Sequence, residues 1–379
     1  MHQKLSHFIY IILLVLLPAL TLGAPPSVNW QTEMRDLIYQ WQTEKAMPAT
    51  TVSIKFLNDP KIYNFYSGTV MLNSFQDVTS HHLFQLGSVT KTYISAVLLQ
   101  LEAEGKLTID SPIGQWFPEY PRWSKITVKQ LLNMTSGIYN FTKMIDLMKM
   151  SPADRLKQWQ PNELVNVAYE HTDYFPPGKA WQYSNTNYVL AGMIIERVTN
   201  QPLATVLQER LLSKLHLTHT YFLPYPYPDT ILQRMVRGYR DKVDITQFNM
   251  SSYGAAGAMI ANSEDVIHWT NALFNGTVLK PQQLTEFMTT VPFQDQPPKP
   301  AGSRYGLGIY LTNIPQLGDV WWYSGVTDGY ISMLAWIPNK KTFIAANIDH
   351  RVGNQYGTLM PEQALFDEII MVLKKNVWH

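Results

Sequence analysis

Cysteine is absent from the 379 residues of the chain. The protein can therefore form no disulfide framework and carry no lipid on an N-terminal cysteine. A thiol nucleophile is excluded as well, so any covalent catalysis must use another side chain.

Charged residues are scarce too. They make up 16% of the chain, the formal net charge is +1, and neither sign forms a long run. The sequence thus lacks the electrostatic signature of a nucleic-acid-binding protein. Its 46% hydrophobic content is enough, at this length, for one large core or two ordinary ones.

Long hydrophobic runs are missing except near the start. Residues 8–17 form an unbroken apolar stretch that is too short to span a bilayer comfortably. It follows a lysine, is closed by Pro18 and precedes small residues, which is typical of a secretory signal peptide. We predict a signal peptide at 1–24 and export of 25–379, with an uncleaved membrane anchor as the alternative. Export without cysteine favours a secreted or periplasmic protein of a bacterial envelope.

Strand-like and helical patterns occupy different parts of the chain. Strand patterns at 50–57 and 62–70 return near the C-terminus, whereas helical patterns and proline-rich connections alternate in the middle. We predict one α+β domain in which residues 28–106 and 250–379 build an antiparallel sheet flanked by helices. The intervening 107–249 should form a mainly helical region.

Ser88 precedes Lys91 by three residues at the head of an apolar helix predicted over 90–104. Residues at this spacing share one helix face, so the serine Oγ and the lysine Nζ can meet. A serine hydroxyl needs a neighbour to take its proton, and burial would lower the lysine pKa enough for that role. The helix N-terminus also offers N–H groups to an oxyanion. Taken alone, the pattern fits a helix-capping serine and a surface lysine equally well.

Tyr183 and Asn185 lie in an extended segment just before another predicted helix. Residues two apart in such a segment point the same way, so both can face one pocket while Ser184 turns away. Tyr-x-Asn occurs once in the chain, as does Ser-x-x-Lys. Asn185 also fits a helix cap, and the two roles are compatible.

These segments, in this order, resemble the serine β-lactamase and penicillin-binding-protein-like hydrolases, especially the class C β-lactamase and D-alanyl-D-alanine carboxypeptidase branch. The resemblance covers nearly the whole mature chain and implies a β-lactamase/transpeptidase-like fold. Each short motif is weak alone, and the order and spacing carry the signal. The segments are LFQLGSVTKT, LLNMTSGI, FPPGKAWQYSNTNYVLAGMIIERVT, YGAAGAMIANSEDV, SRYGLGIYL and YSGVTDGYIS.

The resemblance implies roles for single residues. Ser88 would be the acylated nucleophile, and Lys91 and Tyr183 its proton-handling partners, which would titrate as a coupled pair. Asn185 would bind a substrate amide.

A strand at Tyr323, Ser324 and Gly325 would bind substrate as well, because its glycine lets a ligand lie close to the strand edge. The resemblance implies that the N–H groups of Ser88 and Val326 form an oxyanion hole.

Tyr323 departs from the family pattern, which usually has lysine or histidine at this position. A neutral tyrosine cannot anchor a substrate carboxylate as a cation would, and Tyr323 fits an ordinary sheet aromatic equally well. Asn347, His350 and Arg351 follow the next strand and are candidates for the missing contact.

We therefore predict an exported serine hydrolase that works through an acyl-enzyme on Ser88, foremost a D-alanyl-D-alanine carboxypeptidase acting on peptidoglycan peptides. A β-lactamase or an esterase of the same family is the alternative. A catalytically silent, peptidoglycan-binding envelope protein is the alternative from another class. The mechanism needs no cofactor, and no His-Glu-x-x-His pattern indicates a metal. Expected partners are small molecules or peptidoglycan peptides, no nucleic acid, and a membrane only through an uncleaved leader.

Overall fold

The computed structural model describes residues 29–44, 48–144, 155–223, 226–240, 243–292, 302–349 and 361–378. The signal peptide predicted for 1–24 lies outside these ranges, as do His350 and Arg351. None of the helices within the described ranges combines the length and apolarity needed to cross a membrane.

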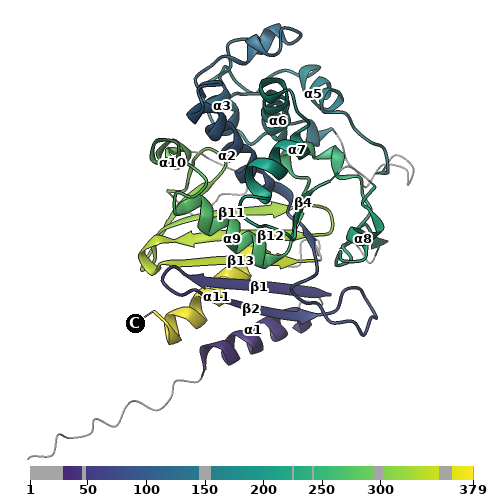
Figure 1. The fold of residues 1–379 in the computed structure, drawn as a ribbon, viewed down its shortest axis with the longest axis vertical. Coiled ribbons are helices and arrows are strands. Elements are labelled where there is room, and N and C mark those ends of the chain that lie inside the picture. Colours follow the sequence, from purple (N-terminus) through teal and green to yellow (C-terminus); the bar gives the residue numbers. More distant parts are fainter. Residues whose placement is uncertain are drawn as a thin grey trace, which may run out of the picture.

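An antiparallel sheet forms the centre of the fold (Figure 1), with the strand order β2-β1-β13-β12-β11-β10-β9-β8. Strands from the two ends of the chain meet where β1 pairs with β13, so the α+β fold expected from the sequence is confirmed. The strands are β1 (Ala49–Phe56), β2 (Ile62–Gly68), β8 (Val291–Pro292), β9 (Arg304–Tyr305), β10 (Tyr310–Ile314), β11 (Gly318–Val326), β12 (Ile331–Ile337) and β13 (Thr342–Ile348).

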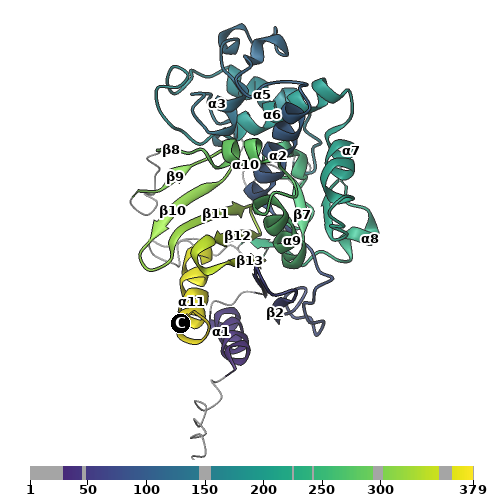
Figure 2. The ribbon, with the colours of Figure 1, turned by 60° about the vertical axis from the view of Figure 1, so that its left-hand side comes forward.

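Helices cover both faces of this sheet (Figure 2). The terminal helices α1 (Trp30–Glu44) and α11 (Pro361–Asn376) pack together on one face through an apolar cluster that includes Met34, Ile38 and Leu365. On the other face lie α2 (Thr90–Ala103), α9 (Ser263–Phe274) and α10 (Pro281–Met288). The sheet is therefore a middle layer, buried on both sides.

The helical region stands above this second face (Figure 1). It differs from the sequence expectation in holding short strands, whose two or three residues are too few to produce a detectable alternation pattern. Its helices are α3 (Val128–Leu132), α5 (Pro161–Tyr169), α6 (Asn185–Thr199), α7 (Leu203–Leu207) and α8 (Asp229–Leu232). The short strands are β4 (Thr220–Phe222), which joins β3 (Phe84–Gln85) and β7 (Met259–Ala261) in a small sheet, and the pair β5 (Tyr239–Arg240) and β6 (Val243–Asp244).

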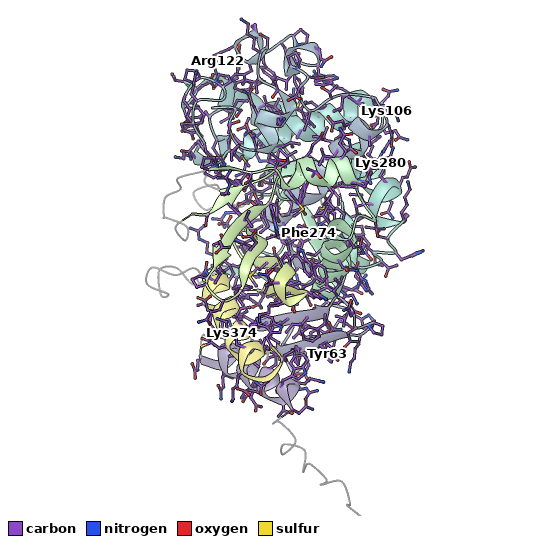
Figure 3. The ribbon with its side chains drawn as sticks, turned by 90° about the vertical axis from the view of Figure 1, so that its left-hand side faces the viewer. Tyr63, Lys106, Arg122, Phe274, Lys280 and Lys374 are labelled. Atoms are coloured by element: carbon purple, nitrogen blue, oxygen red, sulfur yellow. The ribbon has the colours of Figure 1, made fainter. Side chains whose placement is uncertain are left out.

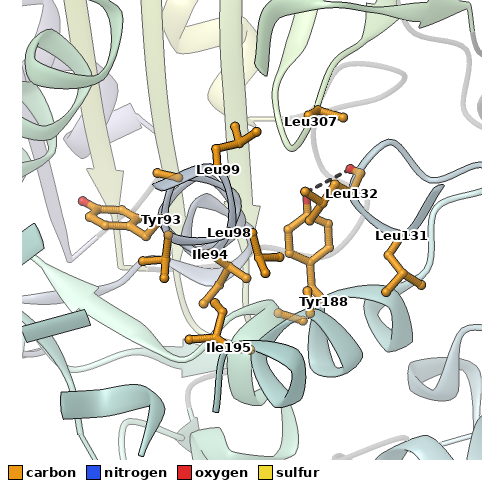
Figure 4. Close-up of a cluster of buried hydrophobic side chains, with 14 of the residues drawn as sticks. Tyr93, Ile94, Leu98, Leu99, Leu131, Leu132, Tyr188, Ile195 and Leu307 are labelled. Atoms are coloured by element: carbon orange, nitrogen blue, oxygen red, sulfur yellow. Dashed lines mark hydrogen bonds between the residues drawn. The ribbon is translucent and has the colours of Figure 1, made fainter. Parts of the chain in front are cut away.

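Helix α2 lies in the middle of the largest core cluster. Figure 4 shows it end-on, with Ile94, Leu98 and Leu99 leaving it in different directions. A helix that is apolar all round must be buried on all sides, and each fully buried aliphatic side chain contributes about 1.5–3 kcal/mol to folding. Beside it, the Tyr188 hydroxyl of α6 donates to the Leu132 carbonyl at 2.9 Å. The first turn of α2 is thereby held in a rigid setting.

Basic side chains, by contrast, are spread over the outside. Figure 3 shows Arg122, Lys106 and Lys374 far apart on the molecule. This distribution agrees with the near-neutral net charge.

Candidate active site

Ser88 lies at the junction between β3 and α2, in the short 3-10 turn Gly87–Val89. Gly87 has a φ of +49°, a left-handed conformation that favours glycine. A Cβ on Gly87 would also lie 2.8 Å from the backbone nitrogen of Val326. The turn can therefore press against β11 only because a glycine precedes the serine.

The structure brings Ser88, Lys91 and Tyr183 together, as the sequence predicted. The Ser88 Oγ lies 2.9 Å from Lys91 Nζ and 2.7 Å from the Tyr183 hydroxyl. One oxygen thus contacts both candidate proton carriers, and it is partly accessible because Ser88 is half-buried.

Lys91 is completely buried, and its Nζ has two other partners. They are the Asn185 Oδ1 at 2.8 Å and the Ala256 carbonyl at 2.7 Å. Burial lowers the pKa of Lys91 well below its usual value, because a charged amine loses its hydration. We infer that the amine is neutral before reaction.

The two carbonyl partners then orient the neutral amine. Carbonyl oxygens only accept hydrogen bonds, so Asn185 and Ala256 take both N–H groups of Lys91. The nitrogen lone pair is left facing Ser88, whose hydroxyl can donate to it while Tyr183 donates to the Ser88 Oγ. This arrangement prepares Lys91 to accept the serine proton.

Tyr183 and Asn185 reach the site through the alternation expected of an extended segment. Ser184, between them, is fully buried and donates to the Tyr139 carbonyl at 3.2 Å. The segment then enters α6, and Asn185 is its first residue. Both neighbours of Ser184 consequently face Ser88 and Lys91.

Sequence reasoning missed the groups that hold Asn185. The Asn140 Oδ1 accepts from the Asn185 backbone N–H at 3.1 Å, and the Thr142 Oγ1 accepts from its side-chain amide at 3.3 Å. Both residues come shortly after the LLNMTSGI segment, which was the available signal. The Ala256 carbonyl was missed because a backbone acceptor leaves no residue-type pattern.

Strand β11 forms the opposite wall at Gly325. A Cβ there would lie 1.8 Å from the Leu86 carbonyl oxygen and 2.8 Å from the Ser88 nitrogen. Only glycine permits this approach, which brings the strand and the Ser88 turn into direct contact.

The Val326 N–H points away from β12, as the strand register shows. Antiparallel pairs alternate between those that exchange hydrogen bonds and those that do not. Thr327 N donates to the Tyr330 carbonyl at 2.9 Å, so the next pair, Val326 opposite Ile331, is not hydrogen-bonded. On the other side β10 ends opposite Trp322, and the turn before α2 packs there instead. The N–H groups of Ser88 and Val326 are thus placed to serve one oxyanion.

Tyr323 does not reach the site surface. Its side chain is 1% exposed, and its hydroxyl hydrogen-bonds the Tyr305 hydroxyl at 2.8 Å. Ser324 is half-buried and, by strand alternation, points to the other face. The substrate contacts expected of these two side chains stay predictions, and the position expected to carry a cation is filled by a buried phenol.

Asn347, the described candidate for the missing contact, is fully buried. In the amide orientation that satisfies its neighbours, it accepts from the Ser263 backbone N–H at 3.2 Å and donates to the Ala346 carbonyl at 3.0 Å. It therefore anchors α9 on the sheet and does not join Ser88.

Substitution Gly325→Ala is expected to lower kcat/KM about 10²–10³-fold, because the new methyl group separates β11 from Ser88 and misplaces the oxyanion donors. It should also destabilise the fold by about 1–3 kcal/mol through overpacking. Steady-state kinetics and denaturant unfolding would measure both. Gly105→Ala is the matched control, since that glycine has a positive φ but nothing within 4 Å of the added Cβ. Normal turnover by Gly325→Ala would contradict the placement of β11.

Known proteins resemble this chain over most of its length. Penicillin-binding protein 4* of Bacillus subtilis (strain 168) is 24% identical over 310 residues, covering 74% of this chain and 67% of that protein. Protein flp of Staphylococcus aureus (strain NCTC 8325 / PS 47) is 26% identical over 305 residues, covering 75% of this chain. The chain matches 58% of the length of protein flp.

Two solved structures extend the likeness to three dimensions. The D-amino acid amidase of Ochrobactrum anthropi SV3, complexed with L-phenylalanine amide, superposes with a TM-score of 0.81 at 24% identity, covering 91% of this chain and 99% of that one. A D-stereospecific amidohydrolase from Streptomyces sp. superposes with a TM-score of 0.70 at 31% identity, covering 83% of this chain and 94% of that one.

The Beta-lactamase family model matches residues 42–366. This range holds both halves of the sheet, the helical region and each side chain that contacts Ser88. The chain therefore belongs to the β-lactamase family and is a serine hydrolase of the β-lactamase and penicillin-binding-protein fold.

Proposed function

We propose that this protein is an exported hydrolase that cleaves amide bonds of D-amino acid derivatives through an acyl-enzyme on Ser88. The observation that carries the proposal is the contact of one Ser88 Oγ with a buried Lys91 amine and the Tyr183 hydroxyl. The D-amino acid preference is supported by the likeness to the two amidohydrolases, one of them 31% identical.

Acylation follows from the geometry. Ser88 attacks the substrate carbonyl carbon while Lys91 takes the hydroxyl proton. The resulting oxyanion receives hydrogen bonds from the N–H groups of Ser88 and Val326. Tyr183, whose hydroxyl lies 2.7 Å from the same Oγ, passes a proton to the leaving nitrogen, and the amine departs.

Deacylation reverses these roles. A water molecule attacks the ester carbonyl and gives its proton to the same pair of side chains. Ser88 recovers its proton as the carboxylic acid product leaves. Asn185 is placed beside Lys91 and can also hydrogen-bond the amide of a bound acyl group.

A D-alanyl-D-alanine carboxypeptidase is the second candidate, because penicillin-binding protein 4* is among the relatives. The same machinery would cleave a peptide bond between D-residues. A β-lactamase, an esterase and a silent peptidoglycan-binding protein stay as outcomes of the test below.

The test offers the purified protein the amides of D- and L-phenylalanine, D-alanyl-D-alanine, a penicillin and p-nitrophenyl acetate. We expect the D-amide to be hydrolysed at least about tenfold faster than its mirror image, since misplacing a reacting group costs this much or more. Mass spectrometry of the peptide containing Ser88 should show a transient acyl adduct. Turnover of D-alanyl-D-alanine above the D-amide would favour the carboxypeptidase, and turnover of only penicillin or only the ester would favour those branches.

Absence of both turnover and adduct with all five compounds would refute the enzyme proposal and favour the silent binding protein. Export is tested on the same material. The exported fraction should contain a protein lacking the mass of residues 1–24, and a retained leader would indicate an anchor instead.

A further inference from the structure

Tyr323 occupies a special position beside the nucleophile. Strand alternation places it on the same face of β11 as Gly325, whose Cβ direction leads to the Ser88 nitrogen. Its ring is nevertheless buried in the main core, with Tyr310 at 5.1 Å between ring centroids. The wall beside Ser88 is therefore backed by a phenol at a point where a long cationic side chain could have lain.

The Tyr323 hydroxyl pairs with that of Tyr305 at 2.8 Å. The Tyr305 ring packs in turn against Trp181 at 5.5 Å. Burial and the surrounding tyrosines raise the pKa of both phenols well above the usual value. The two hydroxyls thus form a neutral pair in an apolar, fully packed environment close to Tyr183.

Two cations described near this end of β11 already have partners. Lys91 Nζ contacts Ser88, Asn185 and a backbone carbonyl. Arg240 donates to Asp328, just beyond the end of β11, at 2.6 Å. Neither is free to neutralise an incoming anion without losing a bond that it makes now.

We propose that the Tyr305–Tyr323 hydroxyl pair sets the substrate class of this site, which prefers D-residue amides and esters without a negative charge on the leaving side over peptides ending in a free carboxylate. The inference rests on the proposed function and narrows it. A carboxylate moved beside this wall loses water and gains no cationic donor in return. Hydrogen bonds to a charged donor are about twice as strong as neutral ones, so the loss is substantial.

A matched pair of peptides tests this preference in the intact protein. N-acetyl-D-alanyl-D-alanine and its C-terminal amide share the scissile bond and differ only in the terminal charge. We expect kcat/KM to be about tenfold higher for the amide. Equal or better use of the free acid would overturn the inference and leave the proposed function standing.

Substitutions assign the preference to the pair. Tyr323→Lys should shift the ratio toward the acid by about tenfold, because the new ammonium can pair with the carboxylate. Tyr323→Phe keeps a neutral ring and should keep the preference for the amide. A folded Tyr323→Lys protein with the wild-type ratio would contradict the assignment.

Tyr323→His, assayed at pH 6, serves if the lysine variant does not fold, because histidine is partly protonated there. An unchanged ratio in that variant would equally overturn the assignment. Turnover of p-nitrophenyl acetate, measured in parallel, separates the two levels of failure. Ester turnover without cleavage of either peptide overturns the inference, and no turnover of any compound overturns the proposed function with it.

Discussion

Ser88→Ala is expected to lower kcat for D-amino acid amides by about 10⁴-fold or more, since loss of a catalytic serine removes the covalent route altogether. The acyl adduct on the peptide of residues 84–105 should disappear from the mass spectrum. The fold should change little, because the deleted hydroxyl is half-buried and surface-near deletions usually cost less than about 1 kcal/mol.

Ser95→Ala provides a control on the same helix. Ser95 is fully buried and its hydroxyl contacts that of Tyr188 at 3.0 Å, one turn beyond Lys91. This variant should lose some stability and keep its turnover and acyl adduct. Amide hydrolysis by Ser88→Ala at the wild-type rate would mean that another group is the nucleophile.

Lys91→Met should lower kcat/KM about 10²–10⁴-fold, the usual contribution of a positioned general base. Methionine is similar in length but cannot accept the Ser88 proton. It also leaves the Ala256 carbonyl and the Asn185 Oδ1 without their donor, which costs about 1–3 kcal/mol for each buried group left unpaired. Kinetics with an activated ester and with an amide should both fall, because both require deprotonation of Ser88.

The same variant tests whether Lys91 is neutral in the folded protein. Its pKa is lowered on folding, so the unfolded chain binds an extra proton between the folded pKa and the unfolded value of about 10.4. The free energy of unfolding of the wild type, relative to Lys91→Met, should therefore rise with pH in that window. The limiting slope is about 1.4 kcal/mol per pH unit.

Denaturant unfolding at pH 7.5 and 9.5 measures this difference. Parallel stability profiles for the wild type and Lys91→Met would show that the folded lysine keeps its proton. In that case Tyr183 would have to act as the base, and the proton path given above would run in the opposite direction.

Local geometry made the catalytic pairs predictable from the sequence. Ser88 and Lys91 meet because residues three apart share a helix face, and the apolar run after them signals a buried helix. Tyr183 and Asn185 face one way because an extended chain alternates. These relations depend on only a few consecutive residues.

Contacts between distant segments could not be predicted in the same way. The Ala256 carbonyl reaches Lys91 across 165 positions, and Asn140 reaches Asn185 across 45. No periodicity links such segments, and a backbone acceptor can be supplied by any residue type. The short strands of the helical region escaped prediction for a related reason, since tertiary pairing creates them.

The sequence by itself determined the nucleophile, its two proton-handling neighbours and the α+β fold, because residue type, helical spacing and strand alternation act locally. Only the tertiary structure decided that Lys91 is buried among carbonyl acceptors and that Gly325 lies against Ser88. It also decided that Tyr323 is enclosed with Tyr305 in the core. Burial, and with it the pKa and reach of a side chain, depends on which distant segments cover it.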